Sequence, residues 1–209
     1  MRCAIVHYHE LALKGRNRDF FEQRLVRNLR LALKDLKIRR IESLQGRIRV
    51  TIPDEVTPDL VTERLRRTCG VSNFLLTESV PLDLTAPDLT TIKQVAERQL
   101  SEQTFNSFRV TAKRADKRLP LTSMDVEREV GGYLHEATGK AVKLKQPDLT
   151  LYIELLTKEA HVAARKIQGP GGMPVGTSGK VACFISGGID SPVPAYRTMK
   201  RACKAAFAH

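Results

Sequence analysis

The six residues from Ser186 to Ser191, which read Ser-Gly-Gly-Ile-Asp-Ser, constrain the fold more than any other stretch of this chain. They follow an apolar run at 181–185, which predicts a buried strand, and precede an apolar pattern at 192–199, which predicts the start of a helix. A strand, a glycine turn and a helix start together gather backbone N–H groups and the positive end of a helix dipole at one point. The stretch therefore predicts a β-α unit that binds phosphate.

Each residue type in this loop has a chemical reason. Gly187 and Gly188 lack the side chains that would block a phosphate and resist a positive φ. The hydroxyls of Ser186 and Ser191 add hydrogen-bond donors. Asp190 would repel phosphate unless its carboxylate caps the helix or helps to hold Mg²⁺, and the sequence leaves both roles open.

Two commoner phosphate-binding motifs do not fit the chain. The Walker A pattern needs a glycine five residues before Gly179-Lys180, where the chain has Pro174, and a hydroxyl where it has Val181. The dinucleotide-binding fingerprint that could begin at Gly169 also meets Pro174, at its third glycine position. The loop at 186–191 therefore belongs to a different class of nucleotide site.

A strand followed by S-G-G-x-D-S resembles the loop of the ATP-pyrophosphatases, which cleave ATP between its α and β phosphates. The stretch from Gly169 to Lys180, with its Pro-Val-Gly-Thr-Ser-Gly-Lys ending, and the run Met199-Lys-Arg201 make the resemblance more specific. They are similar to the tRNA 4-thiouridine synthetases, also called tRNA sulfurtransferases. The resemblance implies ATP and Mg²⁺ as cofactors, with Asp190 as the catalytic support of the loop or of Mg²⁺. The ATP-binding residues that it implies are Phe184, Ile185, Ser186, Gly187, Gly188, Asp190, Ser191 and His209.

The net charge of the chain points to a polyanionic partner. Its 35 basic residues exceed its 23 acidic residues, which gives a formal net charge of +12. Such an excess favours nucleic acid, because lysine and arginine neutralise phosphates and release counterions. Residues 1–49 alone hold thirteen basic and five acidic residues. The charge does not say which polyanion binds.

The first part of the chain predicts the order β-α-β-β-α-β. We expect strands at 2–8, 38–44, 47–52 and 72–80, with a helix after the loop at 9–18 and a second helix from Thr57-Pro58. This order is the ferredoxin-like arrangement, which by itself names no function. The segment Glu10-x-Ala-Leu-Lys-Gly-Arg-Asn-Arg18 resembles E-[IL]-x-L-K-G-x-N-R of the thiouridine synthetases.

A second unit begins after Pro81 and Pro87. We expect helices at 89–100 and 123–138, the latter capped by Ser123 and ended by Gly139, with strands at 105–112, 149–156 and 160–166. The pattern F-x-V-x-x-K-R-x-D-K-x, followed by Pro147-Asp148, is similar to the THUMP domain, which is an RNA-binding module.

Two basic loops are the candidate RNA contacts. An arginine taken singly is more often only solvated, but clusters in two loops could together follow a phosphate backbone. The residues are Lys14, Arg16, Arg18, Lys113, Arg114, Lys117 and Arg118. Few aromatic residues accompany them, so we expect contacts to phosphates and to RNA shape rather than base stacking.

The four cysteines, at positions 3, 69, 183 and 203, are far apart and form no C-x-x-C pair, so we predict free thiols and no metal site. No apolar run approaches the roughly 20 residues that span a bilayer, and the N-terminus does not resemble a signal peptide. We therefore expect a cytoplasmic protein with no membrane partner.

The sequence thus predicts an α+β ferredoxin-like (βαββαβ) domain at 1–78 and an α/β THUMP domain at 79–168, whose profile could start near residue 61. A glycine-rich linker follows at 169–180. Residues 181–209 are the start of an α/β Rossmann-like ATP-pyrophosphatase domain, truncated after its first β-α-β. Two cysteines that carry the persulfide in the resembled family lie further along and are not in this chain.

The implied activity is ATP-dependent transfer of persulfide sulfur to uridine 8 of tRNA, through an adenylated uridine. Its partners would be tRNA and a persulfide donor such as a cysteine desulfurase, and a homodimer is compatible with the sequence. The resembled family also supplies sulfur for the thiazole of thiamine. The alternative is a stand-alone THUMP-type RNA-binding module without catalysis. A weaker third option, a THUMP-containing methyltransferase, leaves the phosphate-binding loop unexplained.

Overall fold

The computed structural model describes residues 1–10, 15, 17–38, 40–44, 46–83 and 85–209. Two compact units can be distinguished. Unit 1 holds residues 1–3 and 75–166, and unit 2 holds residues 4–74 and 167–209. Unit 2 therefore contains both the first part of the chain and the segment with the phosphate-binding loop.

The first part of the chain has the predicted ferredoxin-like order, which the structure confirms. It belongs to unit 2 except for residues 1–3 and the residues from Leu75 onward, which belong to unit 1. The elements are β1 (Arg2–His7), α1 (Arg18–Ala32), the short 3-10 helix η2 (Lys34–Leu36), β2 (Ile41–Leu44), β3 (Arg47–Thr51), α2 (Pro58–Arg66) and β4 (Asn73–Pro81). The strand order is β2-β3-β1-β4, and β2 pairs antiparallel with β3. Helix α1 buries Leu25, Val26 and Leu29 at helical spacing.

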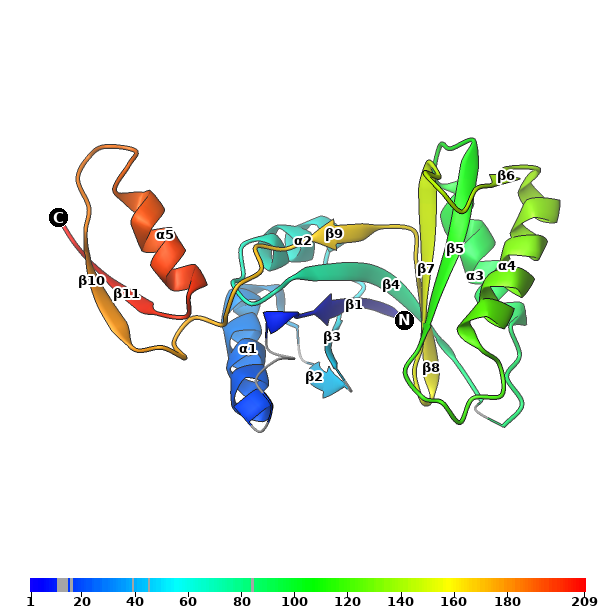
Figure 1. The fold of residues 1–209 in the computed structure, drawn as a ribbon, viewed down its shortest axis with the longest axis horizontal. Helices are drawn as coiled ribbons and strands as arrows, with labels where there is room; N and C mark the ends of the chain where they lie inside the picture. The colour runs from blue at the N-terminus through cyan, green and yellow to red at the C-terminus, as the bar shows by residue number, and fades with distance from the viewer. Residues whose placement is uncertain (11–14, 16, 39, 45, 84) are drawn as a thin grey trace. The chain divides into compact units, whose positions relative to one another are not determined.

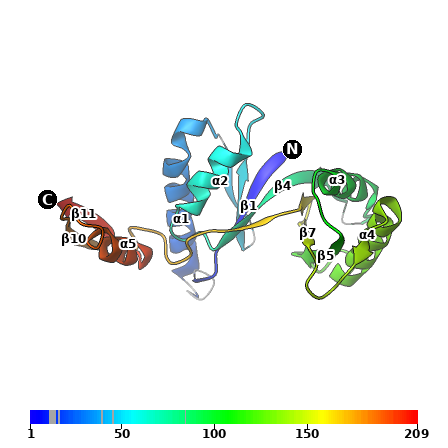
Figure 2. The same ribbon diagram turned by 90° about the horizontal axis from the view of Figure 1, so that it is seen from above.

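Unit 1 contains the second predicted set of elements. They are α3 (Thr90–Ser101), β5 (Ser107–Arg114), α4 (Ser123–Thr138), β6 (Ala141–Val142), β7 (Leu149–Leu155) and β8 (Glu159–Ala163), and the short β9 (Lys166–Gln168) follows. The strands are ordered β4-β8-β7-β5-β6, and β9 pairs with β4. Helices α3 and α4 lie against one face of these strands in both views (Figures 1 and 2). A single apolar core fills the space between them, with Phe108, Val130 and Ile153 among its buried side chains.

The start of α4 differs from the prediction by one residue. Its cap is Thr122 rather than Ser123: the Thr122 hydroxyl accepts a hydrogen bond from the Asp125 N–H, and the Asp125 carboxylate accepts one from the Thr122 N–H at 2.9 Å. This reciprocal pair is a capping box, and it needs its acidic partner three residues after the cap. Gly139 ends the helix with a positive φ, as predicted.

The last segment of unit 2 is a β-α-β unit. Strand β10 (Lys180–Phe184), helix α5 (Pro192–Lys200) and strand β11 (Lys204–Ala208) follow one another, and the two strands lie side by side (Figure 1) and pair in parallel. The expectation that the first of these strands is buried is wrong, because its residues alternate between exposed and half-buried. Helix α5 covers one face of a two-stranded sheet, and no other described element covers the opposite face.

The glycine-rich segment at 169–180 is packed rather than extended between the domains. The Gly169 N–H donates to the Ser72 carbonyl at 2.9 Å, and the Gly171 N–H donates to the Val71 carbonyl at 2.7 Å. A Cβ atom at Gly172 would lie 2.4 Å from the Lys200 carbonyl oxygen, closer than real atoms approach. Glycine is therefore needed here for close backbone packing.

Candidate functional site

The loop between β10 and α5 is closed by its two serines. The Ser186 N–H donates to the Ser191 hydroxyl at 3.1 Å, and that hydroxyl lies 3.3 Å from both the carbonyl and the hydroxyl oxygen of Ser186. The Gly188 N–H donates weakly to the Ser186 hydroxyl at 3.4 Å. The structure thus brings the two predicted serines together at the neck of the loop.

The two loop glycines are exposed, but one of the two predicted reasons for glycine at these positions, a positive φ, does not apply. Neither Gly187 nor Gly188 has a positive φ, so the expectation of left-handed backbone is wrong. A Cβ atom at Gly187 would meet no atom within 4 Å. The protein itself therefore leaves room for a side chain at Gly187. The remaining reason for glycine is that a side chain would block a phosphate that approaches the backbone N–H groups from solvent.

Asp190 does not cap the helix. The capping position of α5 is Ser191, which makes no side-chain cap hydrogen bond, and Pro192 occupies the first turn. Among the residues that the structure describes, Asp190 is exposed and its carboxylate makes no hydrogen bond or ion pair. The structure therefore does not show the capping role, and the role of Asp190 as an oxygen ligand for Mg²⁺ stays a prediction.

Three of the predicted ATP-binding residues, Phe184, Ile185 and His209, lie at one end of the β10-β11 pair. The Ile185 N–H donates to the Ala208 carbonyl at 2.8 Å, which places Ile185 beside the end of β11 where His209 follows. Phe184 is 80% exposed. Because the carboxyl ends of parallel strands meet at one edge of a sheet, the loop and His209 lie at the same edge.

Of the basic residues predicted at the first loop, Lys14 and Arg16 lie outside the described residues. Arg18 is held by a buried pair: its guanidinium donates to the Tyr8 hydroxyl at 3.0 Å, and the Tyr8 hydroxyl donates to the Glu22 carboxylate at 2.5 Å. Burial, and then the Glu22 carboxylate, raise the pKa of Tyr8 to about 12. Tyr8 and Glu22 were not predicted as functional neighbours, because a glutamate on a helix rich in arginine is expected to be a surface charge.

The four basic residues of the second loop differ in their surroundings. The Arg114 guanidinium donates to the carbonyls of Leu119 at 2.8 Å and Leu121 at 3.1 Å, so it holds the loop together. Arg118 pairs with Asp116 at 2.6 Å and lowers the pKa of that carboxyl to about 2. Lys113 and Lys117 are exposed and make no such contact with a described residue.

The Asp148 of the Pro147-Asp148 motif has a structural role. Its carboxylate accepts hydrogen bonds from the N–H groups of Asn106 at 3.0 Å and Ser107 at 2.9 Å, and these bonds lower the pKa of the carboxyl. The motif therefore ties the beginning of β7 to the beginning of β5, which pair in parallel from Phe108 and Leu149 onward.

The burial of the four cysteines, which are all free, differs from the expectation at one position. Cys3 and Cys69 are buried, whereas Cys183 is half-buried rather than buried as expected. The described residues contain no group of three or more His, Cys, Asp or Glu side chains that could hold a metal ion. Any Mg²⁺ at the loop would therefore need oxygen atoms from a bound phosphate as well as Asp190. No helix among the described residues is long and apolar enough to cross a membrane.

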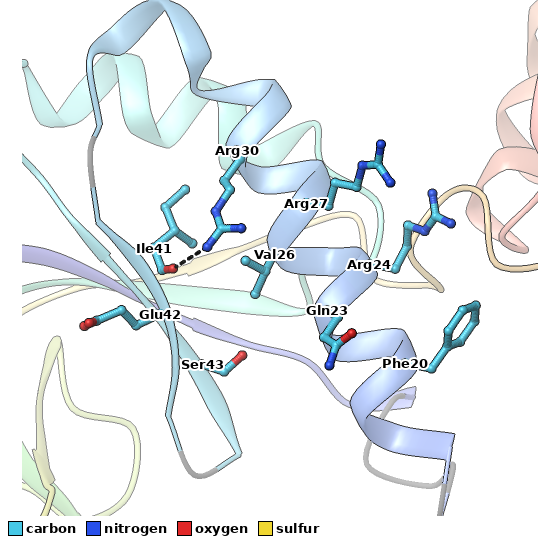
Figure 3. Close-up of a pocket in the computed structure, with 9 residues that line it drawn as sticks. All are labelled: Phe20, Gln23, Arg24, Val26, Arg27, Arg30, Ile41, Glu42 and Ser43. Carbon is cyan, nitrogen blue, oxygen red and sulfur yellow. Dashed lines mark hydrogen bonds between the residues drawn. The ribbon is translucent and has the colours of Figure 1, made fainter.

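A pocket that the sequence analysis missed lies between α1 and β2 in unit 2. It has a cavity volume of about 910 Å³. Figure 3 shows Gln23, Val26 and Arg30 on the side of the helix that faces β2. The lining residues are Phe20, Gln23, Arg24, Val26, Arg27, Arg30, Ile41, Glu42 and Ser43.

The chain is similar to known proteins over nearly its whole length. Three family models match: the ThiI ferredoxin-like domain at residues 3–74, the THUMP domain at 86–164 and the thiamine biosynthesis protein (ThiI) at 176–209. A probable tRNA sulfurtransferase of Thermus thermophilus is 40% identical over 97% of this chain and 48% of its own length. The chain belongs to the tRNA sulfurtransferase family. It spans about half the length of the curated relatives it matches.

Two solved structures support the family assignment. A 4-thiouridine synthetase in complex with RNA and with bound ATP is similar over 99% of this chain and 52% of its own, with 28% identity and a TM-score of 0.81. The protein PH1313 from Pyrococcus horikoshii is similar over 99% of this chain and 67% of its own, with 29% identity and a TM-score of 0.87.

Proposed function

We propose that this chain is the RNA-binding part and ATP-binding loop of an ATP-dependent tRNA sulfurtransferase that makes 4-thiouridine at position 8. The observation that carries the proposal is the loop from Ser186 to Ser191, whose serines close its neck and whose Asp190 carboxylate is exposed without a protein partner. The similarity to a 4-thiouridine synthetase with bound ATP supports it.

In this proposal the loop holds the phosphates of ATP. The exposed amides of Gly187 and Gly188 and the hydroxyls of Ser186 and Ser191 donate to phosphate oxygens, while α5 adds the positive end of its dipole. Asp190 supplies one oxygen ligand to Mg²⁺, whose charge offsets that of the phosphates. Phe184, Ile185 and His209 border the adenosine at the edge of the sheet.

ATP supplies the adenylyl group that turns the C4 oxygen of uridine into a leaving group. That oxygen attacks the α phosphorus and pyrophosphate departs. The terminal sulfur of a cysteine persulfide would then attack C4 as AMP departs with the oxygen, and a second cysteine thiol would break the remaining S–S bond, which leaves the sulfur on C4 and a disulfide between the two cysteines. Both cysteines lie outside these 209 residues. The persulfide would come from a donor such as a cysteine desulfurase. Sulfur supply for the thiamine thiazole and a cytoplasmic location are further parts of the proposal, which the family match supports.

An RNA-binding module without turnover is the second candidate for these 209 residues. It is favoured by the match of residues 86–164 to the THUMP domain and by the exposed Lys113 and Lys117, which can contact phosphates without a bound nucleotide. Release of AMP from ATP in the presence of tRNA separates the two candidates. AMP release supports the enzyme, and tRNA binding without AMP supports the module.

The role of the loop is tested in an intact enzyme that contains these residues. Replacing Asp190 with Asn should lower 4-thiouridine formation by at least about tenfold, because a charged oxygen ligand is lost, and excess Mg²⁺ should restore part of the rate. An unchanged rate would contradict the proposed role of Asp190. Tyr196→Phe on an exposed position of α5 serves as the control.

A further inference from the structure

The pocket between α1 and β2 is bordered by an open sheet edge. In the strand order of the described residues, β2 is at one end and has a neighbour only in β3. The Thr51 N–H donates to the Arg40 carbonyl at 3.0 Å, so Arg40 and Glu42 direct their backbone groups toward β3. Because backbone groups alternate along a strand, those of Ile41 and Ser43 point away from β3.

One contact confirms this direction. The Arg30 guanidinium donates to the Ile41 carbonyl at 3.4 Å from the side of α1, as Figure 3 shows. Ser43 makes no hydrogen bond with a described residue. The open edge thus offers the N–H groups of Ile41 and Ser43 together with the Ser43 carbonyl.

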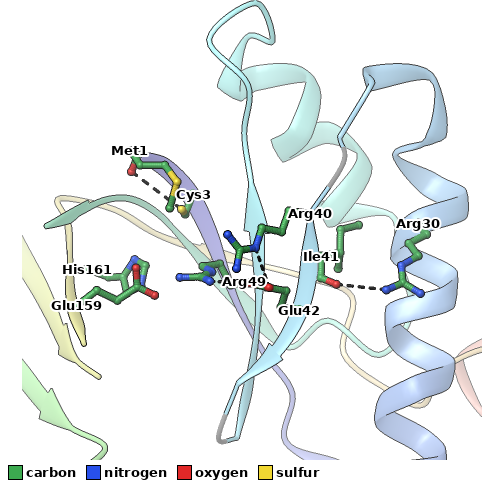
Figure 4. Close-up of polar contacts among 9 residues, drawn as sticks. All are labelled: Met1, Cys3, Arg30, Arg40, Ile41, Glu42, Arg49, Glu159 and His161. Atoms are coloured by element: carbon green, nitrogen blue, oxygen red, sulfur yellow. Dashed lines mark hydrogen bonds and ion pairs between the residues drawn. The ribbon is translucent and has the colours of Figure 1, made fainter. Parts of the chain in front are cut away.

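The surroundings of this edge combine positive charge with an apolar floor. Val26 and Ile41 are buried at the base of the pocket, and three arginines of α1 line it. Among the described lining residues Glu42 is the one acid, and it is held by Arg49 and Arg40, which lower the pKa of its carboxyl (Figure 4). Its charge is thus offset within the β2-β3 hairpin, and the arginines Arg24, Arg27 and Arg30 set the charge of the pocket.

We propose that this pocket binds an extended, acidic segment of a partner protein, which pairs with β2 as an additional strand. Addition of a strand to an open edge provides backbone hydrogen bonds, and the neighbouring pocket selects side chains. Here Val26 and Ile41 would contact an apolar side chain, while Arg27 and Arg30 would pair with acidic side chains. The partner is thus a chain of alternating acidic and apolar residues.

A peptide fits the edge better than an RNA strand. The open edge presents the Ser43 carbonyl oxygen as well as N–H groups, and phosphates can bond only the latter. An apolar floor also favours an aliphatic side chain over a sugar or phosphate. RNA binding at this pocket is accordingly the competing outcome of the test.

The test uses the complete 209-residue chain and a short fluorescein-labelled peptide in which Glu and Val alternate. Fluorescence anisotropy should show saturable binding of this peptide and weaker binding of a version with Lys in place of Glu. Hydrogen exchange should slow at the amides of Ile41 and Ser43 when the acidic peptide is present, because those groups become paired.

Two variants separate strand pairing from charge. Ser43→Pro removes an outward N–H without disturbing the bonds to β3, since proline is tolerated on the open side of an edge strand. It should weaken binding at least about fivefold, as expected for the loss of one backbone hydrogen bond. Arg27→Glu with Arg30→Glu should weaken binding at least about tenfold, because two attractive charges become repulsive.

The control is Arg66→Glu, which makes the same kind of charge change on an exposed position of α2 in the same unit. It should leave peptide affinity within about twofold, because it lies outside the pocket. Absence of peptide binding, or binding that Ser43→Pro leaves unchanged, would overturn the proposal. So would displacement of the peptide by oligouridylate at equal concentration, since it would mark the pocket as an RNA site.

Discussion

At the scale of single residues, the cluster of Tyr8, Glu22 and Arg18 shows how a surface pattern can hide a buried contact. The basic helix face predicted solvated charges, yet Glu22 is buried and accepts a hydrogen bond from Tyr8. Arg18, a predicted RNA contact, is fixed by the same pair. The remaining N–H donors of the Arg18 guanidinium therefore point in a defined direction, whereas the ammonium group of a flexible lysine would not.

This cluster predicts a change of stability at alkaline pH. The folded pKa of Tyr8 is about 12 and its ordinary value is near 10, so the fold favours the neutral hydroxyl. The resulting stabilisation, on the order of 2 kcal/mol, is complete below about pH 10 and is lost as the pH rises toward 12. Tyr8→Phe should be less stable than the wild type at neutral pH, and the gap should close at alkaline pH.

Urea unfolding at several pH values measures this gap. Tyr196→Phe is the control, because Tyr196 is exposed and should show no pH-dependent difference from the wild type. A gap for Tyr8→Phe that stays constant through the alkaline range would contradict the assigned pKa.

At the scale of elements, local patterns predicted order and type well and predicted burial less well. The βαββαβ order and the buried face of α3, with Ile92, Val95, Ala96 and Leu100, were both readable from periodicity. The cap of α4 was misplaced by one residue because Thr122 and Ser123 are equally good caps. Only the position of Asp125 distinguishes them, since it lies three residues after Thr122.

The exposure of β10 could not be predicted from its apolar run. An apolar strand is buried only if other elements cover it, and that depends on the rest of the sheet rather than on the strand itself. The same limit applies to the loop glycines, whose φ values depend on how Ser186 and Ser191 close the neck. The pocket beside α1 was missed because it depends on the position of β2, which begins nine residues after α1 ends.

The contacts of the segment at 169–180 predict that Gly172, rather than Gly171, is needed for close packing against the end of α5. Gly171 and Gly172 both have a positive φ, but only at Gly172 would a Cβ atom collide, at 2.4 Å from the Lys200 carbonyl oxygen. Gly171→Ala should cost about 1 kcal/mol from its backbone conformation alone. Gly172→Ala should cost at least about 2 kcal/mol, because the segment must also move away from the end of α5.

Thermal unfolding of the two variants gives the comparison, and hydrogen exchange of α5 locates the effect. Faster exchange of α5 in Gly172→Ala but not in Gly171→Ala is the expected pattern. Equal losses for both variants would mean that close packing against Lys200 contributes nothing beyond the φ requirement.

At the scale of the whole molecule, the excess of basic residues separates into groups with different roles. Arg114 and Arg118 have partners in their own loop, whereas Lys113 and Lys117 extend into solvent. Composition predicted a polyanionic partner, and the family match now favours tRNA. Composition could not distinguish arginines with structural partners from lysines that are free to contact phosphate. A count of charges does not reveal that the carbonyls of Leu119 and Leu121 accept hydrogen bonds from Arg114.

This division predicts how the salt dependence of tRNA binding should change. If Lys113 and Lys117 each neutralise a phosphate, replacing both with Gln should reduce the slope of log K against log salt by about 1 to 2 and should leave the melting temperature unchanged. Arg114→Gln should instead lower the melting temperature, because two loop carbonyls lose their donor.

The control must be a lysine that lies away from the glycine-rich segment. Lys200 and Lys204 both lie beside that segment and are therefore unsuitable. Lys158, at the turn before β8, is exposed and provides a single-site control in unit 1. An unchanged slope of log K against log salt for the double variant would place the phosphate contacts elsewhere. If Lys158→Gln changed this slope as much per charge as the double variant, total charge alone would govern tRNA binding.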